Sequence, residues 1–296
     1  MNNSESSLVV SVIVPAYNES GKVREFIEAI ESQSYPRSKI DLIIVDNGST
    51  DDTFAQLKKY DLKLLKAPEK QSPYYARNVG FRAAEGDIIA LLDMNKIPAQ
   101  DWLQTAVEYF AKTGTDLLTG KIEFANSSNP TVYEVMDSIM YFNNEYLVKS
   151  SNACAAGNLL FKKEVLEEIG DFPELRSGMD MLWTKLATDK GFRLDYVEDV
   201  KVMIRPKKKK GLLKKSIRVG TGHPFMWSKD GVSVLKILLV TGKNFVPPFP
   251  GHLRKTIAKR RVNTHGISFG KLYLVFYFNQ ILVGIGRIIG LKEIFR

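Results

Sequence analysis

Two of three candidate aspartates stand where a short apolar run gives way to polar residues. Asp46 ends the run DLIIVD, Asp93 ends DIIALLD, and Asp180 lies in SGMDML. Carboxylate oxygens are the ligands that Mg²⁺ and Mn²⁺ prefer, and these ions share their coordination shell with substrate phosphates. From the residues alone, Asp93 therefore has two interpretations: a ligand in a metal and phosphate site, or an ordinary turn or helix-capping aspartate.

The residue that would complete such a site is not a carboxylate. Two positions after Asp93, the chain has Asn95. An amide oxygen can still ligate Mg²⁺ or Mn²⁺, but the site loses one negative charge, which weakens metal binding.

Two common nucleotide sites are disfavoured by the glycine pattern. The turn after the first apolar run reads VPAYNESG and lacks G-x-G-x-x-G, and no G-x-x-x-x-G-K-S/T motif occurs. The segment GIGRIIG near the C-terminus has the wrong spacing and lies in an apolar run. Neither a nicotinamide enzyme nor an ordinary NTPase is favoured.

The elements that must position these residues alternate along the first 200 residues. Strand-like runs such as LVVSVIVPAY, DLIIVDNGS and DIIALLD are separated by segments with helical spacing, for example Val23, Phe26, Ile27 and Ile30. This alternation predicts βαβ units and a mostly parallel sheet covered on both faces. In such sheets ligands bind at the carboxyl ends of the strands, where PAYNE, DNGSTD and DMNK lie.

The positive charge of the chain is concentrated in its C-terminal third. Residues 201–296 hold 21 Lys or Arg and only two acids, a net charge of +19, whereas the first 200 residues carry −10. The run 207–210 with Lys214, Lys215 and Arg218 predicts contact with an anionic membrane surface or an anionic substrate; a merely solvated face is the alternative. Nucleic acid is not expected, because residues 205–218 contain no aromatic residue.

A last apolar segment, residues 272–286, is shorter than the about 20 residues that a membrane-spanning helix needs. It predicts an interfacial or re-entrant segment, or a helix that docks on another subunit of a homo-oligomer. The N-terminus lacks the pattern of a secretory signal, and Cys154 is the one cysteine. We therefore expect a cytoplasmic protein, peripheral at the cytoplasmic membrane.

Five sequence blocks carry a family resemblance. They are SVIVPAYNE, IIVDNGSTDDT, ARNVGFRAAEGDIIALLDMNKIPAQDWL, AAGNLLFKKEVLEEIGDF and GMDMLWTKLATDKGFRL. In this order and spacing they resemble the family 2 glycosyltransferases of the GT-A fold, over about residues 9 to 205. The resemblance implies a Rossmann-like αβα sandwich with a mostly parallel mixed sheet. It also implies sugar transfer from a nucleotide-sugar donor, here expected to be a UDP-sugar, with inversion and a divalent metal, Mg²⁺ or Mn²⁺.

The resemblance also implies roles for residues of the donor site. Pro15, Tyr17 and Glu19 would line the nucleoside pocket, and Asp46 would contact the base or its ribose. Arg77 would face the diphosphate, for which a guanidinium fork is suited; a salt bridge on an exposed helix face is the alternative.

The metal and the base complete the implied site. Asp93 and Asn95 fall on the two positions of the family's D-x-D metal motif. His223 would add a ligand, or else is a turn residue. Asp180 matches the general base that takes the proton of the acceptor hydroxyl, or it caps the helix that follows. Trp183, one turn later, would stack on an acceptor sugar or pack in the core.

These expectations define two domains. A GT-A nucleotide-sugar-binding and catalytic domain is expected over residues 1–225, and a basic, apolar helical extension that associates with the membrane over residues 226–296. The acceptor would be a sugar or a lipid-linked saccharide in polysaccharide or glycolipid synthesis.

Two other classes of protein compete with a working transferase. A binding or scaffold protein with a degenerate GT-A fold is the main one, because Asn95 replaces an acid. A nucleotidyltransferase is disfavoured, because PAYNESG is acidic where a triphosphate-binding loop would be glycine-rich and basic.

Overall fold

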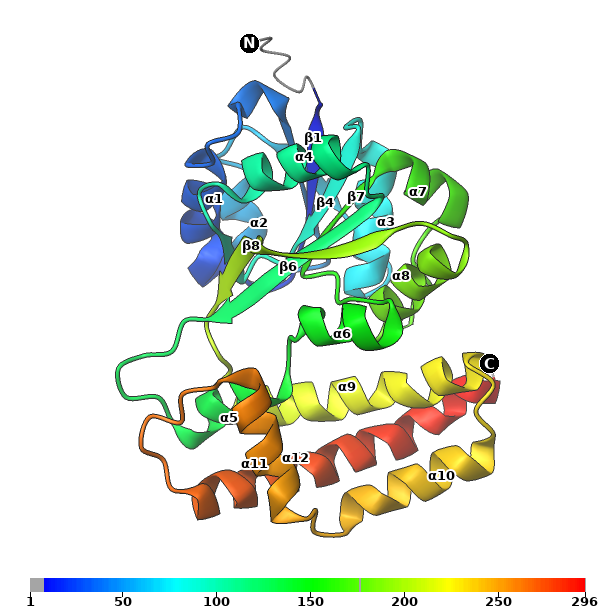
Figure 1. Ribbon diagram of the computed structural model, residues 1–296. Coiled ribbons are helices and arrows are strands. Elements are labelled where there is room, and N and C mark those ends of the chain that lie inside the picture. The colour runs from blue at the N-terminus through cyan, green and yellow to red at the C-terminus, as the bar shows by residue number, and fades with distance from the viewer. Residues whose placement is uncertain (1–7, 176, 296) are drawn as a thin grey trace. The chain divides into compact units, whose positions relative to one another are not determined.

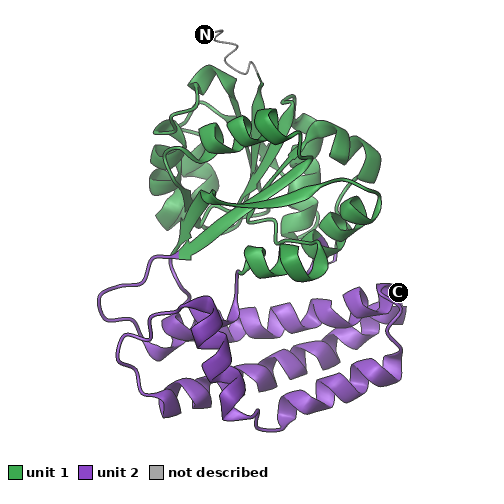
Figure 2. Ribbon diagram, in the orientation of Figure 1, with its two compact units in different colours: residues 1–123, 143–174, 180–204 green, residues 124–142, 175–179, 205–296 purple. Residues whose placement is uncertain are grey.

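The computed structural model describes residues 8–175 and 177–295 and divides the chain into two compact units. Unit 1 comprises residues up to 123 together with 143–174 and 180–204, and unit 2 comprises 124–142, 175–179 and the residues from 205 onward (Figure 2). The boundary expected after residue 225 falls inside α9 (Lys209–Lys229), a continuous helix. The structural division therefore comes earlier than the predicted one, because α9 packs with the C-terminal helices.

Unit 1 is built on one eight-stranded sheet with the order β3-β2-β1-β4-β7-β6-β8-β5. Its strands are β1 (Val10–Ala16), β2 (Ile40–Asp46), β3 (Lys63–Lys66), β4 (Ile88–Leu92), β5 (Lys96–Pro98), β6 (Leu117–Phe124), β7 (Asn158–Lys162) and β8 (Leu194–Ile204). The first four pair in parallel, and β7 joins β4 and β6 in antiparallel fashion. The predicted α/β class with a mostly parallel mixed sheet is confirmed.

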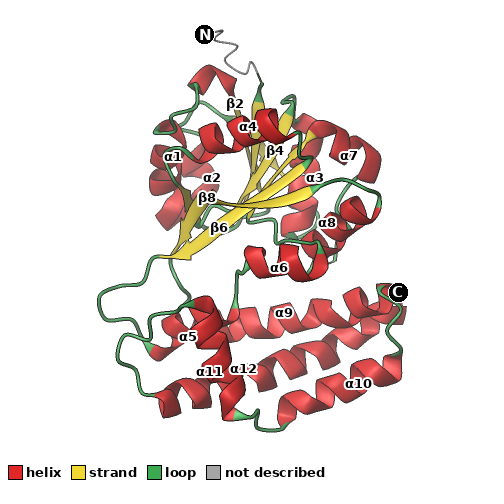
Figure 3. Cartoon of the chain, in the orientation of Figure 1, coloured by secondary structure: helices red, strands yellow, loops and turns green. Residues whose placement is uncertain are grey.

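Helices flank this sheet on both sides (Figures 1 and 3). They are α1 (Val23–Glu31), α2 (Thr53–Leu57), α3 (Pro73–Ala83), α4 (Trp102–Thr113), α6 (Asn144–Ser151), α7 (Lys163–Ile169) and α8 (Met179–Asp189). The four apolar residues of α1 that follow helical spacing are all buried. Since both faces are covered, β4 is buried along its whole length, which explains its continuous apolar sequence.

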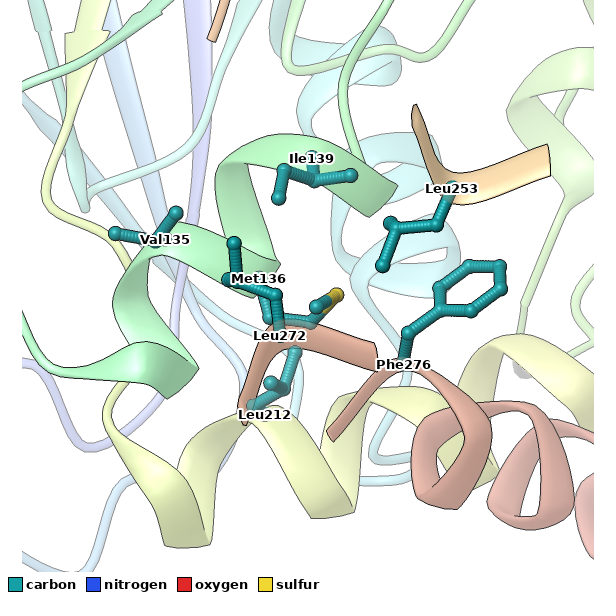
Figure 4. Packing of buried hydrophobic residues seen from close by; sticks show 7 residues of the cluster. All are labelled: Val135, Met136, Ile139, Leu212, Leu253, Leu272 and Phe276. Carbon is teal, nitrogen blue, oxygen red and sulfur yellow. The ribbon is translucent and has the colours of Figure 1, made fainter. Parts of the chain in front are cut away.

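Unit 2 is helical. It contains α5 (Val132–Met140), α9, α10 (Val234–Gly242), the short 3₁₀ helix η3 (Lys243–Phe245), α11 (Pro250–Arg260) and α12 (Phe269–Gly290). A cluster of seven buried side chains from α5, α9, α11 and α12 forms part of its core (Figure 4): Val135, Met136, Ile139, Leu212, Leu253, Leu272 and Phe276. The sequence analysis did not predict α5 or α6 between β6 and β7, although Val132, Val135, Met136 and Ile139 of α5 follow the spacing of one helix face.

The C-terminal helix is longer than its apolar run suggested. Among the described residues, 269–295 form one helical segment that is long and apolar enough, by length and composition alone, to cross a membrane. The run ends at Arg287 in sequence, but the helix continues to Gly290. The argument that this segment is too short to span was therefore wrong. Its Leu272 and Phe276 are buried in the unit 2 core.

Candidate active site

The sheet brings the ends of β2, β1 and β4 together. In the parallel register Ala16 pairs with Asp46 on one side of β1, and Ile13 pairs with Leu91 on the other. Asp46 therefore ends β2 at the same edge of the sheet at which Asp93 follows β4. This is the edge at which open α/β sheets bind ligands.

Asp93 lies between two buried cations. Arg77, only 5% exposed on α3, brings its Nη2 to 2.5 Å from Asp93 Oδ1. The ammonium of Lys96, which is fully buried, pairs with Oδ2. Asp93 itself remains 31% exposed. Arg77 is thus not part of a salt bridge on an exposed helix face, and it points its positive charge into the site.

Lys96 is the residue that the sequence analysis missed. It starts β5, three residues after Asp93 and directly after Asn95. Gly157 makes room for it, because a Cβ at that glycine would collide with the Lys96 ammonium and lie 3.1 Å from Asp93 Oδ2. The sequence did contain a signal for it: a lysine directly follows Asn95, the residue that replaces the second acid of D-x-D, and a basic residue there changes the charge of the motif.

Asp180 lies in the first turn of α8, and both oxygens of its carboxylate are engaged. The hydroxyl of Tyr74 donates to Oδ1 at 3.0 Å, and the backbone N–H of Ala156 donates to Oδ2 at 2.9 Å. These partners belong to other segments, so the carboxylate is oriented from outside its own helix. The two hydrogen bonds hold it in one position, as a general base requires.

The helix α3 connects the two acids. Tyr74 and Arg77 are one turn apart on it, and the Arg77 guanidinium lies 5.7 Å from the centre of the Tyr74 ring. Tyr74 contacts Asp180 and Arg77 contacts Asp93. The neighbours Ala156 and Gly157 approach the same two acids from the segment before β7. Asp93 and Asp180 therefore belong to one site within unit 1.

Three polar atoms of this site are buried without a hydrogen-bond partner among the residues described. They are Oδ1 of Asp46, Nε of Arg77 and Oδ1 of Asn95. A buried polar atom without a partner costs about 1–3 kcal/mol, so it points to a ligand that would satisfy it. The Asn95 oxygen has the chemistry of a Mg²⁺ or Mn²⁺ ligand.

The protein supplies few ligands for such an ion. Within residues 8–175 and 177–295, no group of three or more His, Cys, Asp or Glu side chains is placed to hold a metal. Asp93 and Asn95 fit an ion that keeps water and substrate phosphate in most of its shell, as Mg²⁺ usually does. They do not fit an all-protein cage.

The residues expected around the nucleoside lie on the loop after β1. Tyr17 follows that strand and is 42% exposed, whereas Pro15 lies inside it beside Val45. The backbone N–H of Glu19 donates to Thr53 at 2.8 Å, and the Glu19 carboxylate pairs with Lys22. These residues line the same edge of the sheet as Asp46.

The loop after β2 is pinned to the loop after β1. Burial alone would raise the pKa of Asp51, but hydrogen bonds from Thr53 and Ser20 lower it to about 2. The backbone N–H of Asn18 donates to the hydroxyl of Ser49 at 3.0 Å, and the side-chain oxygen of Asn18 accepts from the backbone N–H of Thr50 at 2.8 Å. Hydrogen bonds therefore join the two loops beside Asp46.

His223 lies in unit 2, on α9. Its Nδ1 accepts a hydrogen bond of 3.1 Å from Nε of Arg287, and its ring stacks on Trp227. Burial, and then the charge of Arg287, lower the pKa of His223 to about 4. Because Nδ1 accepts from Arg287, the neutral ring carries its proton on Nε2, and neither nitrogen offers a free lone pair to a metal in this arrangement. The role of His223 as a metal ligand stays a prediction and would require the hydrogen bond to Arg287 to break.

Two other residues belong to the core of unit 1. Trp183 is fully buried, packs on Phe161 and Phe172, and donates from its indole to the Gly170 carbonyl. Packing, and not stacking on an acceptor sugar, is its role. Burial, and then the nearby Asp180 charge, raise the pKa of the Cys154 thiol far above its usual range. Cys154 is therefore unsuited to act as a nucleophile.

Comparison with known proteins shows the family of the chain. The glycosyl transferase family 2 model matches residues 11–170, more than half of the chain. The chain therefore belongs to glycosyl transferase family 2. The glycosyltransferase AglE of Haloferax volcanii is 33% identical over 291 residues, which cover 94% of this chain and 95% of AglE.

Solved structures share the fold at lower identity. The mannosyltransferase PcManGT of Pyrobaculum calidifontis, in complex with GDP-Man and Mn²⁺, gives a TM-score of 0.65 at 20% identity, with 97% of this chain and 88% of that chain covered. TarS 1–349 of S. aureus, in complex with UDP-GlcNAc, gives 0.55 at 18% identity, with 97% and 89% covered. Both are GT-A glycosyltransferases, which confirms the predicted fold.

Proposed function

We propose that this glycosyltransferase uses a nucleotide-sugar donor, assisted by a divalent metal, and inverts the configuration at the transferred sugar. The observation that carries the proposal is the link through α3, which holds the phosphate-facing Arg77 and the base-orienting Tyr74 one turn apart. An inverting transfer needs these two functions close together: a base for the incoming hydroxyl and positive charge for the leaving diphosphate.

In the proposed reaction, Asp180 accepts the proton of the acceptor hydroxyl. The hydroxyl oxygen forms a bond to the anomeric carbon, the bond from that carbon to the donor phosphate breaks, and a nucleoside diphosphate leaves. Arg77 and Lys96 hold positive charge at the diphosphate, and Asp93 fixes both cations. Asp93 and Asn95 would hold Mg²⁺ or Mn²⁺, which would neutralise negative charge on the departing diphosphate.

The donor proposed is a UDP-sugar, with Pro15, Tyr17, Glu19 and Asp46 around the nucleoside. The Asp46 oxygen that lacks a partner supports this, because a ribose or base N–H or O–H would satisfy it. Of the structural relatives, one binds GDP-Man and another UDP-GlcNAc. A GDP-sugar is therefore the competing donor.

Unit 2 is proposed to associate with an anionic membrane surface on the cytoplasmic side, where a lipid-linked acceptor would be presented. Its support is charge together with exposed apolar side chains. These project from α10, α12 and the segment around η3: Val234, Leu235, Leu238, Leu239, Phe245, Val246, Phe249, Leu274, Phe278, Ile285, Ile288 and Ile289. Basic residues near an anionic leaflet contribute about 1 kcal/mol each, and apolar contacts add to them.

One lysine of the predicted basic cluster does not belong to that surface. Lys215 is buried and pairs with the buried Asp137 at 2.7 Å, between the rings of Tyr141 and Phe142. Because its charge is neutralised inside unit 2, Lys215 stabilises the helices and does not contact lipid. The other basic residues of the cluster remain candidates for contact with lipid.

The proposal is tested by donor hydrolysis. Wild-type protein is incubated with UDP- and GDP-sugars and Mn²⁺, with and without chelator, and the nucleoside diphosphate released is measured. We expect release from one nucleotide sugar, lost with chelator, and lowered about 100-fold in Arg77→Ala. The control Lys185→Ala, which removes an exposed cation paired with Asp189 on α8, should match wild type.

Two outcomes would contradict parts of the proposal. If chelator does not change the release of nucleoside diphosphate, the proposed need for a metal is wrong. No release from any nucleotide sugar, even with lipid and saccharide acceptors added, would favour the alternative of a degenerate GT-A binding protein, for which Asn95 and Lys96 at the metal motif would then be the explanation.

A further inference from the structure

Arg287 is a partly buried cation that pairs with neutral groups alone. It lies near the end of α12, where its Nε donates to His223 and its Nη1 donates to Asn244 Oδ1 at 2.5 Å. Its guanidinium lies 4.6 Å from the centre of the Trp227 ring. None of the described acidic residues forms a salt bridge with it. Burial lowers the pKa of Arg287 to about 10, so the charge is desolvated but persists at neutral pH.

The hydrogen bond from Arg287 fixes the protonation of His223. An arginine Nε is always a donor, so Nδ1 of His223 must be the acceptor. In a neutral imidazole the proton then resides on Nε2, which becomes a donor. His223 therefore presents an N–H group at Nε2, and through its other ring nitrogen it is hydrogen-bonded to Arg287.

Two donors thus remain available to a ligand. Neither Nη2 of Arg287 nor Nε2 of His223 makes a hydrogen bond within the described part of the chain, and neither is among the buried atoms without a partner. They offer one full positive charge and two N–H groups on two residues that are hydrogen-bonded to each other. This combination suits an anionic oxygen, and above all a phosphate, which guanidinium groups bind with several oxygens at once.

Exposed apolar side chains lie in the same elements as these donors. Phe245 and Val246 follow Asn244, which accepts from Arg287, and both are exposed. The Phe245 ring lies beside Gly284, one turn before Arg287 on α12. A soluble phosphate would use the donors but not these side chains. A lipid whose phosphate lies at Arg287 would use both.

We propose that Arg287 and His223 form a binding site for the phosphate group of a membrane lipid, with its chains along the apolar residues of η3 and α12. The site makes the proposed association of unit 2 with a membrane more specific, because it binds the phosphate group of a lipid and not only a negatively charged surface. It does not depend on sugar transfer, so its test needs no donor.

The test compares vesicle binding of the full chain in three forms. Wild type, Arg287→Gln and Lys236→Gln are floated with phosphatidylcholine vesicles that contain phosphatidic acid, whose phosphate is a terminal monoester. Lys236 is an exposed cation on α10 and loses the same charge. We expect Arg287→Gln to weaken binding at least about tenfold more than Lys236→Gln, since a hydrogen bond from a desolvated charge contributes more than an exposed charge does. Equal losses in the two variants would overturn the site.

A second measurement separates lipid from free phosphate. Inorganic phosphate and pyrophosphate are added in a thermal-shift experiment, where a bound ligand raises Tm. A Tm increase in wild type that Arg287→Gln loses, without any preference for phosphatidic acid vesicles, would replace the lipid with a soluble phosphate and overturn the lipid assignment. If Arg287→Gln does not fold, Arg287→Lys is used in its place, because it keeps the charge but loses the forked guanidinium. Binding of phosphatidic acid vesicles by Arg287→Lys that equals wild type would then contradict the proposal.

Discussion

At the scale of single residues, Asp93 has two partners that compete with any ligand. Arg77 and Lys96 are both buried, and the carboxylate between them is the group that balances their charge. Asn95 is different, because its buried oxygen has no partner among the described residues. Asp93 therefore contributes to folding as well as to the site, whereas Asn95 contributes to the site alone.

This difference predicts opposite behaviour of two variants. Asp93→Asn leaves two buried cations without their carboxylate and should lower the free energy of unfolding by roughly 2–4 kcal/mol, less than a fully buried pair would lose because Asp93 is partly exposed. Asn95→Ala should change stability by less than about 1 kcal/mol yet raise the Mn²⁺ concentration needed for half-maximal turnover. Denaturant unfolding and a metal titration measure these effects. A large stability loss in Asn95→Ala would show that its oxygen is structural.

The sequence predicted the acids of the site and Arg77, but not the second cation, Lys96. Asp46, Asp93 and Asp180 lie in recognisable motifs, so their type and place could be inferred. The lysine beside Asn95 was visible in the sequence, but its burial could not be inferred, because it depends on a gap opposite Gly157 that exists only once β4, β5 and the segment before β7 are packed. The role of Trp183 likewise depended on Phe161 and Phe172, which are distant in sequence.

At the scale of elements, α9 and α12 pack with their backbones in contact, and they lie side by side in Figure 1. A Cβ on Gly286 would collide with the carbonyl oxygen of Ile217 and lie 2.9 Å from the Cα of Gly220. The segment GIGRIIG, which has the wrong spacing for a nucleotide site, is therefore a helix-packing sequence. Its glycines let two helices approach closely.

Gly286→Ala should therefore destabilise unit 2, by about 1–3 kcal/mol, because the added methyl meets backbone that cannot move aside. Gly270→Ala is the matched control in the same helix, since a Cβ there meets no atom within 4 Å and alanine favours helix. Hydrogen exchange of α9 and α12 compares the two. Faster exchange in Gly270→Ala than in Gly286→Ala would contradict this account of the helix pair.

The prediction of elements succeeded where an apolar pattern was used. β1, β2, β4 and α1 have continuous or periodic apolar patterns, and these predicted them correctly. The helix α5 also has an apolar face and a capping box of Thr131 with Glu134, which the sequence analysis overlooked. The helix α6 is mostly polar and begins at Asn143, which is a weak signal in a sequence. The length of α12 was underestimated because Arg287 is accommodated by His223 and Asn244.

At the scale of the whole molecule, the two units differ in charge. The acids of the site lie in unit 1, whereas residues 205–296 contain 20 Lys or Arg and two acids. Deleting residues 266–296 would be a poor test of membrane binding, because Leu272 and Phe276 belong to the core of unit 2. Point variants on exposed apolar side chains leave that core intact.

We expect the double variant Leu239→Glu and Phe249→Glu to float with anionic vesicles much less than wild type, because both side chains are exposed and each would bring a negative charge to the lipid. Leu186→Glu, on the exposed side of α8 in unit 1, should float like wild type. Unchanged flotation of the double variant would count against a lipid-facing surface. A change in its sedimentation would then identify the surface as a contact between copies of the chain.

The central claim, that Asp180 is the base of a nucleotide-sugar-dependent transfer, is tested most directly in Asp180→Asn. Thermal shift with the donor and Mn²⁺, together with transfer to an acceptor, separates donor binding from chemistry. The account predicts the same increase in Tm as in wild type, with transfer lowered about 10²- to 10⁴-fold. Transfer at the wild-type rate in Asp180→Asn would contradict it.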